Sequence, residues 1–121
     1  MATLQETVDT YGAAWRETDP AKRLELLETV WADDAVYVDP MARVEGRAAL
    51  VAHIGEVLAS TGGRVEITSR PNAHHDVAHF TWHMVGPDGA ILVRGHDMAT
   101  LDTDGRIARL AGFFGDPDPL A

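Results

Sequence analysis

Apolar residues recur with a helical period in three segments of the first half of the chain, residues 3–17, 20–31 and 47–59. The second segment opens with Asp19 and Pro20, a pair that commonly caps a helix and fills its first position. The pattern therefore predicts three helices before the middle of the chain.

The second half alternates apolar and polar residues with a period of two, which is typical of strands. The predicted strands are residues 64–70, 76–85, 90–101 and 106–114. A shorter extended segment, 35–39, precedes a loop over residues 40–46. Three helices followed by antiparallel strands predict an α+β domain whose helices pack on one face of a curved sheet. We expect residues 1–115 to form this single domain and residues 116–121 a short, flexible tail.

Strand parity places a carboxyl group among positions that face the core. Asp97 shares its side of the predicted strand with Val93, Ala99 and Leu101. Strands disfavour aspartate, and an acid on an apolar face must be paired, be protonated or line a cavity. Asp97 is therefore the most informative single position in the sequence.

Two further polar groups fall on apolar faces. Tyr11 lies on the apolar stripe of the first predicted helix, and Asp39 shares the parity of Tyr37 and precedes Pro40. Each also has a purely structural explanation, because a core tyrosine often keeps its hydroxyl at the rim and an aspartate before proline often forms a turn. Periodicity leaves open whether these groups converge on Asp97.

Composition narrows the classes of function. The chain has 121 residues, no cysteine and a formal net charge of -9. Disulfides and thiolate chemistry are excluded, and the charge argues against nucleic acid and against anionic membranes as partners. No apolar run approaches the roughly 20 residues that span a bilayer, and the polar N-terminus lacks a signal-peptide pattern. We therefore expect a cytoplasmic protein.

The histidines do not predict a metal site. His79 and His83 lie four residues apart on one predicted strand, a separation of about 13 Å that is too large for one shared ion. Both also have the parity opposite to the apolar face. We expect no metal and no organic cofactor.

Several short segments, spread over nearly the whole chain, carry a resemblance to a known family. The chain resembles the nuclear-transport-factor-2-like superfamily, and within it the ketosteroid-isomerase-like and SnoaL-like (polyketide-cyclase) branch. The resemblance implies a conical, strongly curved and mainly antiparallel sheet that is closed by three N-terminal helices around an internal pocket. The segments that carry it are Tyr11-Gly-Ala-Ala-Trp15, Trp31 to Pro40, Gly46 to Leu50, Arg94-Gly-His-Asp97, Asp104 to Ile107 and Gly112 to Gly115.

The resemblance also implies roles for the three polar groups. Tyr11 falls where the ketosteroid isomerases place an oxyanion-hole tyrosine, Asp39 where they place the proton-shuttling base, and Asp97 where they place a protonated, hydrogen-bond-donating acid. The implied activity is proton transfer next to a carbonyl group, on a small apolar or carbonyl-containing substrate and without a cofactor. The side chains expected to line the pocket are Trp15, Trp31, Tyr37, His53, Phe80, Trp82, Met84 and Phe113.

Two other functions remain open for the same pocket. A polyketide cyclase would use Asp97 as acid and base in an intramolecular aldol closure. A non-catalytic domain would only bind a small apolar ligand or serve for dimerisation. The opposite face of the sheet is partly polar, which suits a homodimer interface, and the resemblance implies pairing through that face. The residues of this outer face are His79, Thr81, His83, His96, Met98 and Thr100.

Overall fold

The first two helices begin at side chains that satisfy free backbone N–H groups. In the computed structural model, which describes residues 2–120, α1 (Leu4–Ala14) starts at Thr3, whose hydroxyl accepts from the Glu6 N–H at 3.1 Å while the Glu6 carboxylate accepts from the Thr3 N–H at 3.0 Å. α2 (Pro20–Val30) starts at Asp19, as predicted. α1 ends before the predicted residue 17.

The strand β1 (Trp31–Asp39) follows α2 without a loop and pairs with β2 (Ala42–Glu45) as an antiparallel hairpin. The sequence predicted a strand only over residues 35–39 and a loop over 40–46, and the loop prediction was wrong. A strand as short as β2 gives almost no alternation for a periodic pattern to detect. The hairpin places Asp39 at the end of β1, directly before the turn.

The third helix lies between two glycines with left-handed backbone angles. α3 (Arg47–Thr61) follows Gly46, which has a φ of 88°, and ends at Gly62, which has a φ of 65°. Residues with a Cβ rarely adopt such angles, so glycine is the natural residue at both ends. The helix runs two residues beyond the predicted end at residue 59.

The remaining strands complete one sheet in residues 2–120. Their bounds are β3 (Arg64–Ile67), β4 (Asn72–His74), β5 (Val77–Val85), β6 (Ile91–Leu101) and β7 (Ile107–Phe114). The central strands β5, β6 and β7 form the predicted antiparallel meander, and β1 extends the sheet by pairing parallel to β7. The order across the sheet is β2-β1-β7-β6-β5-β3, with β4 pairing to β5 outside this path. The parallel pair and β4 were not predicted.

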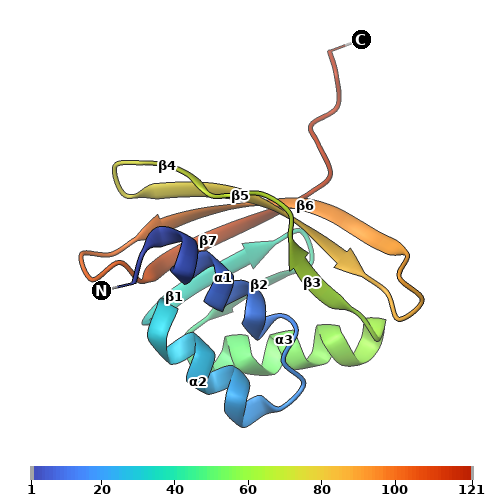
Figure 1. Ribbon diagram of the computed structural model, residues 1–121, viewed down its shortest axis with the longest axis horizontal. Helices are drawn as coiled ribbons and strands as arrows, with labels where there is room; N and C mark the ends of the chain where they lie inside the picture. Colours follow the sequence, from blue (N-terminus) through green and yellow to red (C-terminus); the bar gives the residue numbers. More distant parts are fainter. Residues whose placement is uncertain (1, 121) are drawn as a thin grey trace.

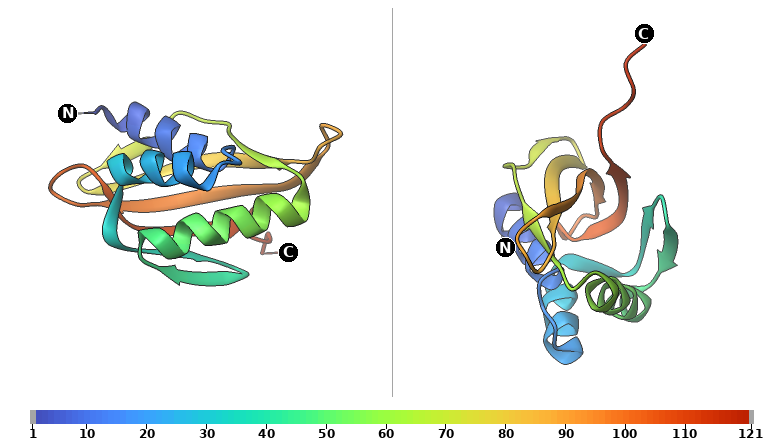
Figure 2. Two further views of the ribbon diagram at one scale, coloured as in Figure 1. Left: turned by 90° about the horizontal axis from the view of Figure 1, so that it is seen from below. Right: turned by 90° about the vertical axis from the view of Figure 1, so that its right-hand side faces the viewer.

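The sheet curls, and the helices cover its concave face (Figures 1 and 2). α1 contacts β3 near one edge of the sheet, α3 contacts β1 and β2 near the other, and α2 contacts both helices. The described residues thus form the predicted α+β cone, with the core and a cavity between helices and sheet.

Residues 116–120 extend away from the sheet (Figure 1). The predicted flexibility of this tail stays a prediction, and the predicted boundaries at residues 1 and 121 lie outside the described residues. None of the helices in residues 2–120 is long and apolar enough to cross a membrane.

Candidate active site

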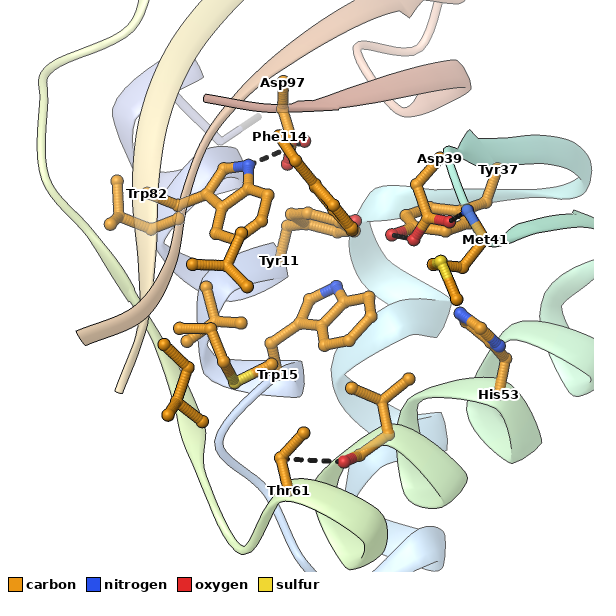
Figure 3. Close-up of a pocket in the computed structure, with 16 residues that line it drawn as sticks. Tyr11, Trp15, Tyr37, Asp39, Met41, His53, Thr61, Trp82, Asp97 and Phe114 are labelled. Carbon is orange, nitrogen blue, oxygen red and sulfur yellow. Dashed lines mark hydrogen bonds between the residues drawn. The ribbon is translucent and has the colours of Figure 1, made fainter. Parts of the chain in front are cut away.

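A cavity of about 210 Å³ lies between the concave face of the sheet and the helices. Its wall is largely apolar and aromatic, and polar groups enter it from α1, β1, α3 and β6 (Figure 3). It opens at one side past Met41, Leu92 and Phe114, which are all exposed. The described residues that line it are Tyr11, Trp15, Tyr37, Asp39, Met41, His53, Val57, Thr61, Val65, Ile67, Trp82, Met84, Leu92, Val93, Asp97 and Phe114.

Asp97 lies in the middle of β6 and points into this cavity. Only 6% of the residue is exposed, and the indole Nε1–H of Trp82 donates a hydrogen bond to its Oδ1 at 2.9 Å. Burial raises the pKa of Asp97 to about 7; the Trp82 hydrogen bond opposes this rise, and the charge of Asp39 adds to it. At neutral pH the carboxyl group therefore spends much of its time protonated, with Oδ2 free to donate.

Two glycines on neighbouring strands make room for this arrangement. Gly95 lies directly opposite Trp82 in the β5–β6 pair, and a Cβ there would overlap the indole ring. Gly112 lies opposite Asp97 in the β6–β7 pair, and a Cβ there would approach Asp97 Oδ1 to 3.0 Å and Asp39 Cβ to 3.5 Å. Gly112 thus separates the two carboxyl-bearing residues by the width of one strand without filling the space between them.

Asp39 has very different partners. Its Oδ1 accepts hydrogen bonds from the backbone N–H groups of Met41 at 2.8 Å and Ala42 at 2.9 Å, and its Oδ2 accepts from the Tyr37 hydroxyl at 2.6 Å. Such donors suit a charged carboxylate. Burial raises the pKa of Tyr37 far above its ordinary value, so this phenol stays a donor. Asp39 therefore stabilises the β1–β2 turn, as expected for an aspartate before proline, and also faces the cavity.

Tyr11 brings a hydroxyl that has no hydrogen-bond partner among the described residues, although the atom is buried. Its ring is stacked on Trp31, with ring centres 5.7 Å apart and planes 15° from parallel, and meets the edge of Phe80 at 6.4 Å. Burial, followed by the charge of Asp97, raises the pKa of Tyr11 well above its ordinary value, and the neighbouring Trp15 side chain offsets only part of this rise, so the hydroxyl keeps its proton. Leaving such a group unpaired costs about 1–3 kcal/mol. A ligand oxygen would remove this cost.

Apart from Phe113, the predicted pocket residues divide into two groups. Trp31 and Phe80 are fully buried but do not line the cavity, because they pack behind the ring of Tyr11 and hold it in place. The residues that do line it are Trp15, Tyr37, His53, Trp82 and Met84.

The placement of Phe113 in the pocket was wrong. Phe113 pairs with His96 and lies with it on the outer face of the sheet, with 53% of the residue exposed. Gly112 and Phe114 take the inward positions, opposite Asp97 and Gly95. Two adjacent residues of a strand point to opposite faces of the sheet. Only the register of β7 with β6 decides which of the two phenylalanines faces inward.

Most of the apolar lining was not predicted from the sequence. Val65 and Ile67 share one parity on β3, which could have identified them, and Val57 lies one turn beyond His53 on α3. Met41 lies in the turn between β1 and β2, where no periodicity applies. Leu92 lies within β6 at a register shift with β5, so strict alternation assigns it to the face opposite Val93. Of these residues, the exposed Met41 and Leu92 lie at the mouth of the cavity, and the buried Val65 belongs to its inner wall.

Two histidines lie together on the outer face of the sheet, away from the cavity. The rings of His79 and His96 stack with centres 5.2 Å apart, and His79 Nε2 lies 3.0 Å from His96 Nδ1. Within residues 2–120, His, Asp and Glu side chains do not gather in a group of three that could hold a metal ion.

The chain is similar to known proteins over nearly its whole length. Residues 8–110 match the sequence model of the SnoaL-like domain. A structure of a proposed isomerase of the SnoaL-like family from Agrobacterium tumefaciens is 32% identical, with a TM-score of 0.87 over 95% of this chain and 100% of that one. No curated protein matches the chain.

More distant structures share the fold. One is a proposed polyketide cyclase from Sinorhizobium meliloti, 24% identical, with a TM-score of 0.69 over 88% of this chain and 92% of that one. Another, from Catenulispora acidiphila, has a ketosteroid-isomerase-like fold and was solved with trimethylamine; it is 22% identical, with a TM-score of 0.75 over 93% of this chain and 88% of that one. The cone, its cavity and the family match agree with the resemblance found in the sequence, and the chain belongs to the SnoaL-like domain family.

Proposed function

We propose that the protein is a cofactor-independent isomerase that moves a proton between two carbons next to a carbonyl group. One observation carries the proposal: three polar groups line the same apolar cavity. They are a phenol without a hydrogen-bond partner among the described residues, a carboxyl group whose pKa is about 7, and a carboxylate that accepts several hydrogen bonds. These groups are Tyr11, Asp97 and Asp39. The 32% identical relative that is described as a proposed isomerase supports the same choice of reaction.

The reaction needs a base and a place for negative charge. The substrate carbonyl oxygen would accept hydrogen bonds from the Tyr11 hydroxyl and from protonated Asp97. Asp39 would remove a proton from the α-carbon of a β,γ-unsaturated ketone. The electron pair of the broken C–H bond would form a double bond to the carbonyl carbon, and the C=O π pair would move to the oxygen, which gives a dienolate. Asp39 would then return the proton to the γ-carbon. The double bond shifts, and no oxidant or reductant is consumed.

The surrounding aromatic wall would strengthen these steps. Trp15 and Trp82 line the cavity beside the polar groups and are mostly buried. A hydrogen bond to a developing negative charge is stronger in such an apolar site than in water. The donors also need no rearrangement during the reaction, because packing already fixes the Tyr11 ring and the Trp82 hydrogen bond fixes Asp97.

The proposal can be tested with a small probe before any natural substrate is known. We would incubate β,γ-cyclohexenone with the protein in deuterium oxide and follow both conjugation and deuterium uptake by NMR. We expect the wild type to accelerate both. Asp39→Asn should lower the rate by about 10²-fold or more, the contribution of a general base.

Phe113→Leu is the matched control, because Phe113 lies on the outer face and should leave the rate unchanged. If Asp39→Asn lowers the rate by less than about tenfold, Asp39 is not the base.

A cyclase is the second candidate, and the surroundings of Asp97 favour it specifically. A carboxyl group with a pKa of about 7 can both donate and accept a proton at neutral pH. It could therefore act as acid and base in an aldol closure, the chemistry that the name of the Sinorhizobium meliloti relative suggests for that protein. This reading predicts that Asp97→Asn abolishes turnover while Asp39→Asn has a small effect.

A further inference from the structure

The charges around the cavity restrict what can bind there. Asp39 and Asp97 both line it, while no lysine or arginine of the described residues does so. An anionic group inside would lose its hydration next to a carboxylate, with no cation to compensate. The cavity therefore selects against carboxylates and phosphates and admits neutral molecules.

The size of the cavity restricts the occupant further. Its volume is about 210 Å³. An engineered cavity of about 150 Å³ holds benzene, whereas pockets for drug-sized ligands begin at about 300 Å³. One substituted ring, or a compact pair of rings, fits within the walls. A four-ring steroid would extend far beyond the mouth.

His53 adds a polar contact that the proton transfer does not use. Its Nε2 is buried and has no hydrogen-bond partner among the described residues. The ring lies 5.5 Å from the ring of Tyr37 and 6.2 Å from that of Trp15, measured between centres. It enters from α3 on the helical side, whereas Asp97 enters from the sheet (Figure 3).

The mouth can admit a ligand to this nitrogen. Met41 lines the same cavity as His53, and 81% of Met41 is exposed. Its unbranched side chain can change rotamer at little cost. A polar substituent that moved Met41 aside would reach His53. It would supply the hydrogen bond that the Nε2 atom lacks among the described residues.

We propose that the substrate is a neutral carbonyl compound of one ring or a compact pair of rings, and that a second polar substituent on it forms a hydrogen bond with His53. The inference rests on the proposed proton-transfer function for the carbonyl end, where Tyr11 and Asp97 bind the oxygen. His53 then acts as a specificity residue that fixes which way round the ring lies over Asp39.

Phenols provide probes, because a phenol hydroxyl resembles the enol oxygen of the intermediate. We would titrate the wild type with ethylphenol, hydroxymethylphenol and hydroxybenzoate, each as the meta and para isomer, and obtain Kd by NMR. Ethyl and hydroxymethyl have nearly the same size, so their comparison isolates the second hydrogen bond. We expect hydroxymethylphenol to bind about fivefold more tightly in at least one isomer, and hydroxybenzoate to bind at least about tenfold more weakly.

The variants assign the preference to one residue. His53→Leu should abolish the preference for hydroxymethyl over ethyl, and His53→Gln, which keeps a hydrogen-bonding group, should retain part of it. Val57→Ala, one turn along α3, should weaken both ligands equally because it removes only apolar wall. If His53→Leu fails to fold, His53→Phe makes the same comparison.

The proposal is overturned if hydroxybenzoate binds as tightly as the neutral ligands, if no phenol binds, or if the preference survives in His53→Leu. These results do not depend on turnover. A failure of the deuterium experiment with an intact phenol preference would therefore remove the proposed isomerase while leaving the ligand class in place.

Discussion

The two carboxyl groups of the cavity sit in contrasting surroundings. Asp39 accepts hydrogen bonds from two backbone N–H groups and from the Tyr37 hydroxyl. Asp97 accepts one from the Trp82 indole and is otherwise enclosed by apolar groups, which raises its pKa to about 7. The donors around Asp39 suit a charged base, and the apolar enclosure of Asp97 suits a protonated acid.

The fold explains why the surroundings of the two carboxyl groups differ. Asp39 lies where β1 ends, so the backbone N–H groups of the following turn are free to bind its side chain. Asp97 lies in the middle of β6, between β5 and β7, where the backbone N–H groups are engaged in the sheet. Only a side chain could supply a donor there, and Trp82 does. Position along a strand thus sets the chemical role of each acid.

The largest expected effect comes from replacing each acid by its amide. Asp39→Asn removes the base and should lower turnover of β,γ-cyclohexenone by about 10²-fold or more at neutral pH.

Asp97→Asn keeps a donor that cannot ionise, and its Oδ1 can still accept from Trp82. Wild-type activity should fall as pH rises through about 7, where Asp97 loses its proton, and Asp97→Asn should lack this fall. Rates at about pH 6 and about pH 8.5 decide the matter. Equal pH profiles for wild type and Asp97→Asn would contradict the role of Asp97 as a protonated donor.

A smaller effect is expected at Tyr11. Tyr11→Phe deletes a hydroxyl without a partner among the described residues, so the unliganded protein should not lose stability. Turnover should nevertheless fall by about tenfold to 10²-fold, because the enolate loses one donor. Thermal unfolding and NMR rate measurements on the same sample test both parts. A large drop in Tm would show that the hydroxyl has a structural partner instead.

Protein stability should also depend on Asp97. The folded state raises the pKa of this group, so it holds the proton more tightly than the unfolded chain does. The resulting stabilisation is complete below the ordinary aspartate pKa and is lost as pH rises through about 7. Relative to wild type, Asp97→Asn should therefore gain a few kcal/mol of unfolding free energy between acid and mildly alkaline pH. Urea unfolding at both ends of this range measures the gain, and a constant difference would contradict it.

The smallest effect on activity is expected on the outer face of the sheet. We expect a second copy to pack there, against residues such as His79, Met98 and the exposed Phe113. Phe113→Glu should weaken self-association while leaving the β,γ-cyclohexenone rate within about twofold, because the cavity lies on the other side of the sheet. Analytical ultracentrifugation compares the two proteins. A wild type that sediments as a monomer would remove the expected dimer.

Much of the fold follows from local patterns. Caps, turns and alternation predicted the helices and β5, β6 and β7, because these signals lie within a few residues of each element. The short strands β2 and β4 offered no such signal. The parallel pairing of β1 with β7 joins segments far apart in the chain, and sequence periodicity does not encode which strands become neighbours.

In the site, too, some features follow from local patterns and others from long-range packing. Parity alone identified Asp97 as an inward-facing acid, and its burial confirms this. Which of Phe113 and Phe114 faces inward depends on a register that no local pattern supplies. The Trp82 hydrogen bond depends on the space that Gly95 leaves across the strand, and it follows from packing rather than from spacing.

The protonation state of Asp97 tests the account most directly. Carboxyl-carbon NMR of isotope-labelled aspartate, followed through a pH titration, reports the pKa of each side chain. The account predicts one resonance that titrates near pH 7, that is absent in Asp97→Asn and that moves to higher pH in Trp82→Phe, because the indole no longer stabilises the anion. If every aspartate titrates near the ordinary value of about 4, Asp97 is charged at neutral pH and cannot donate to a substrate oxygen.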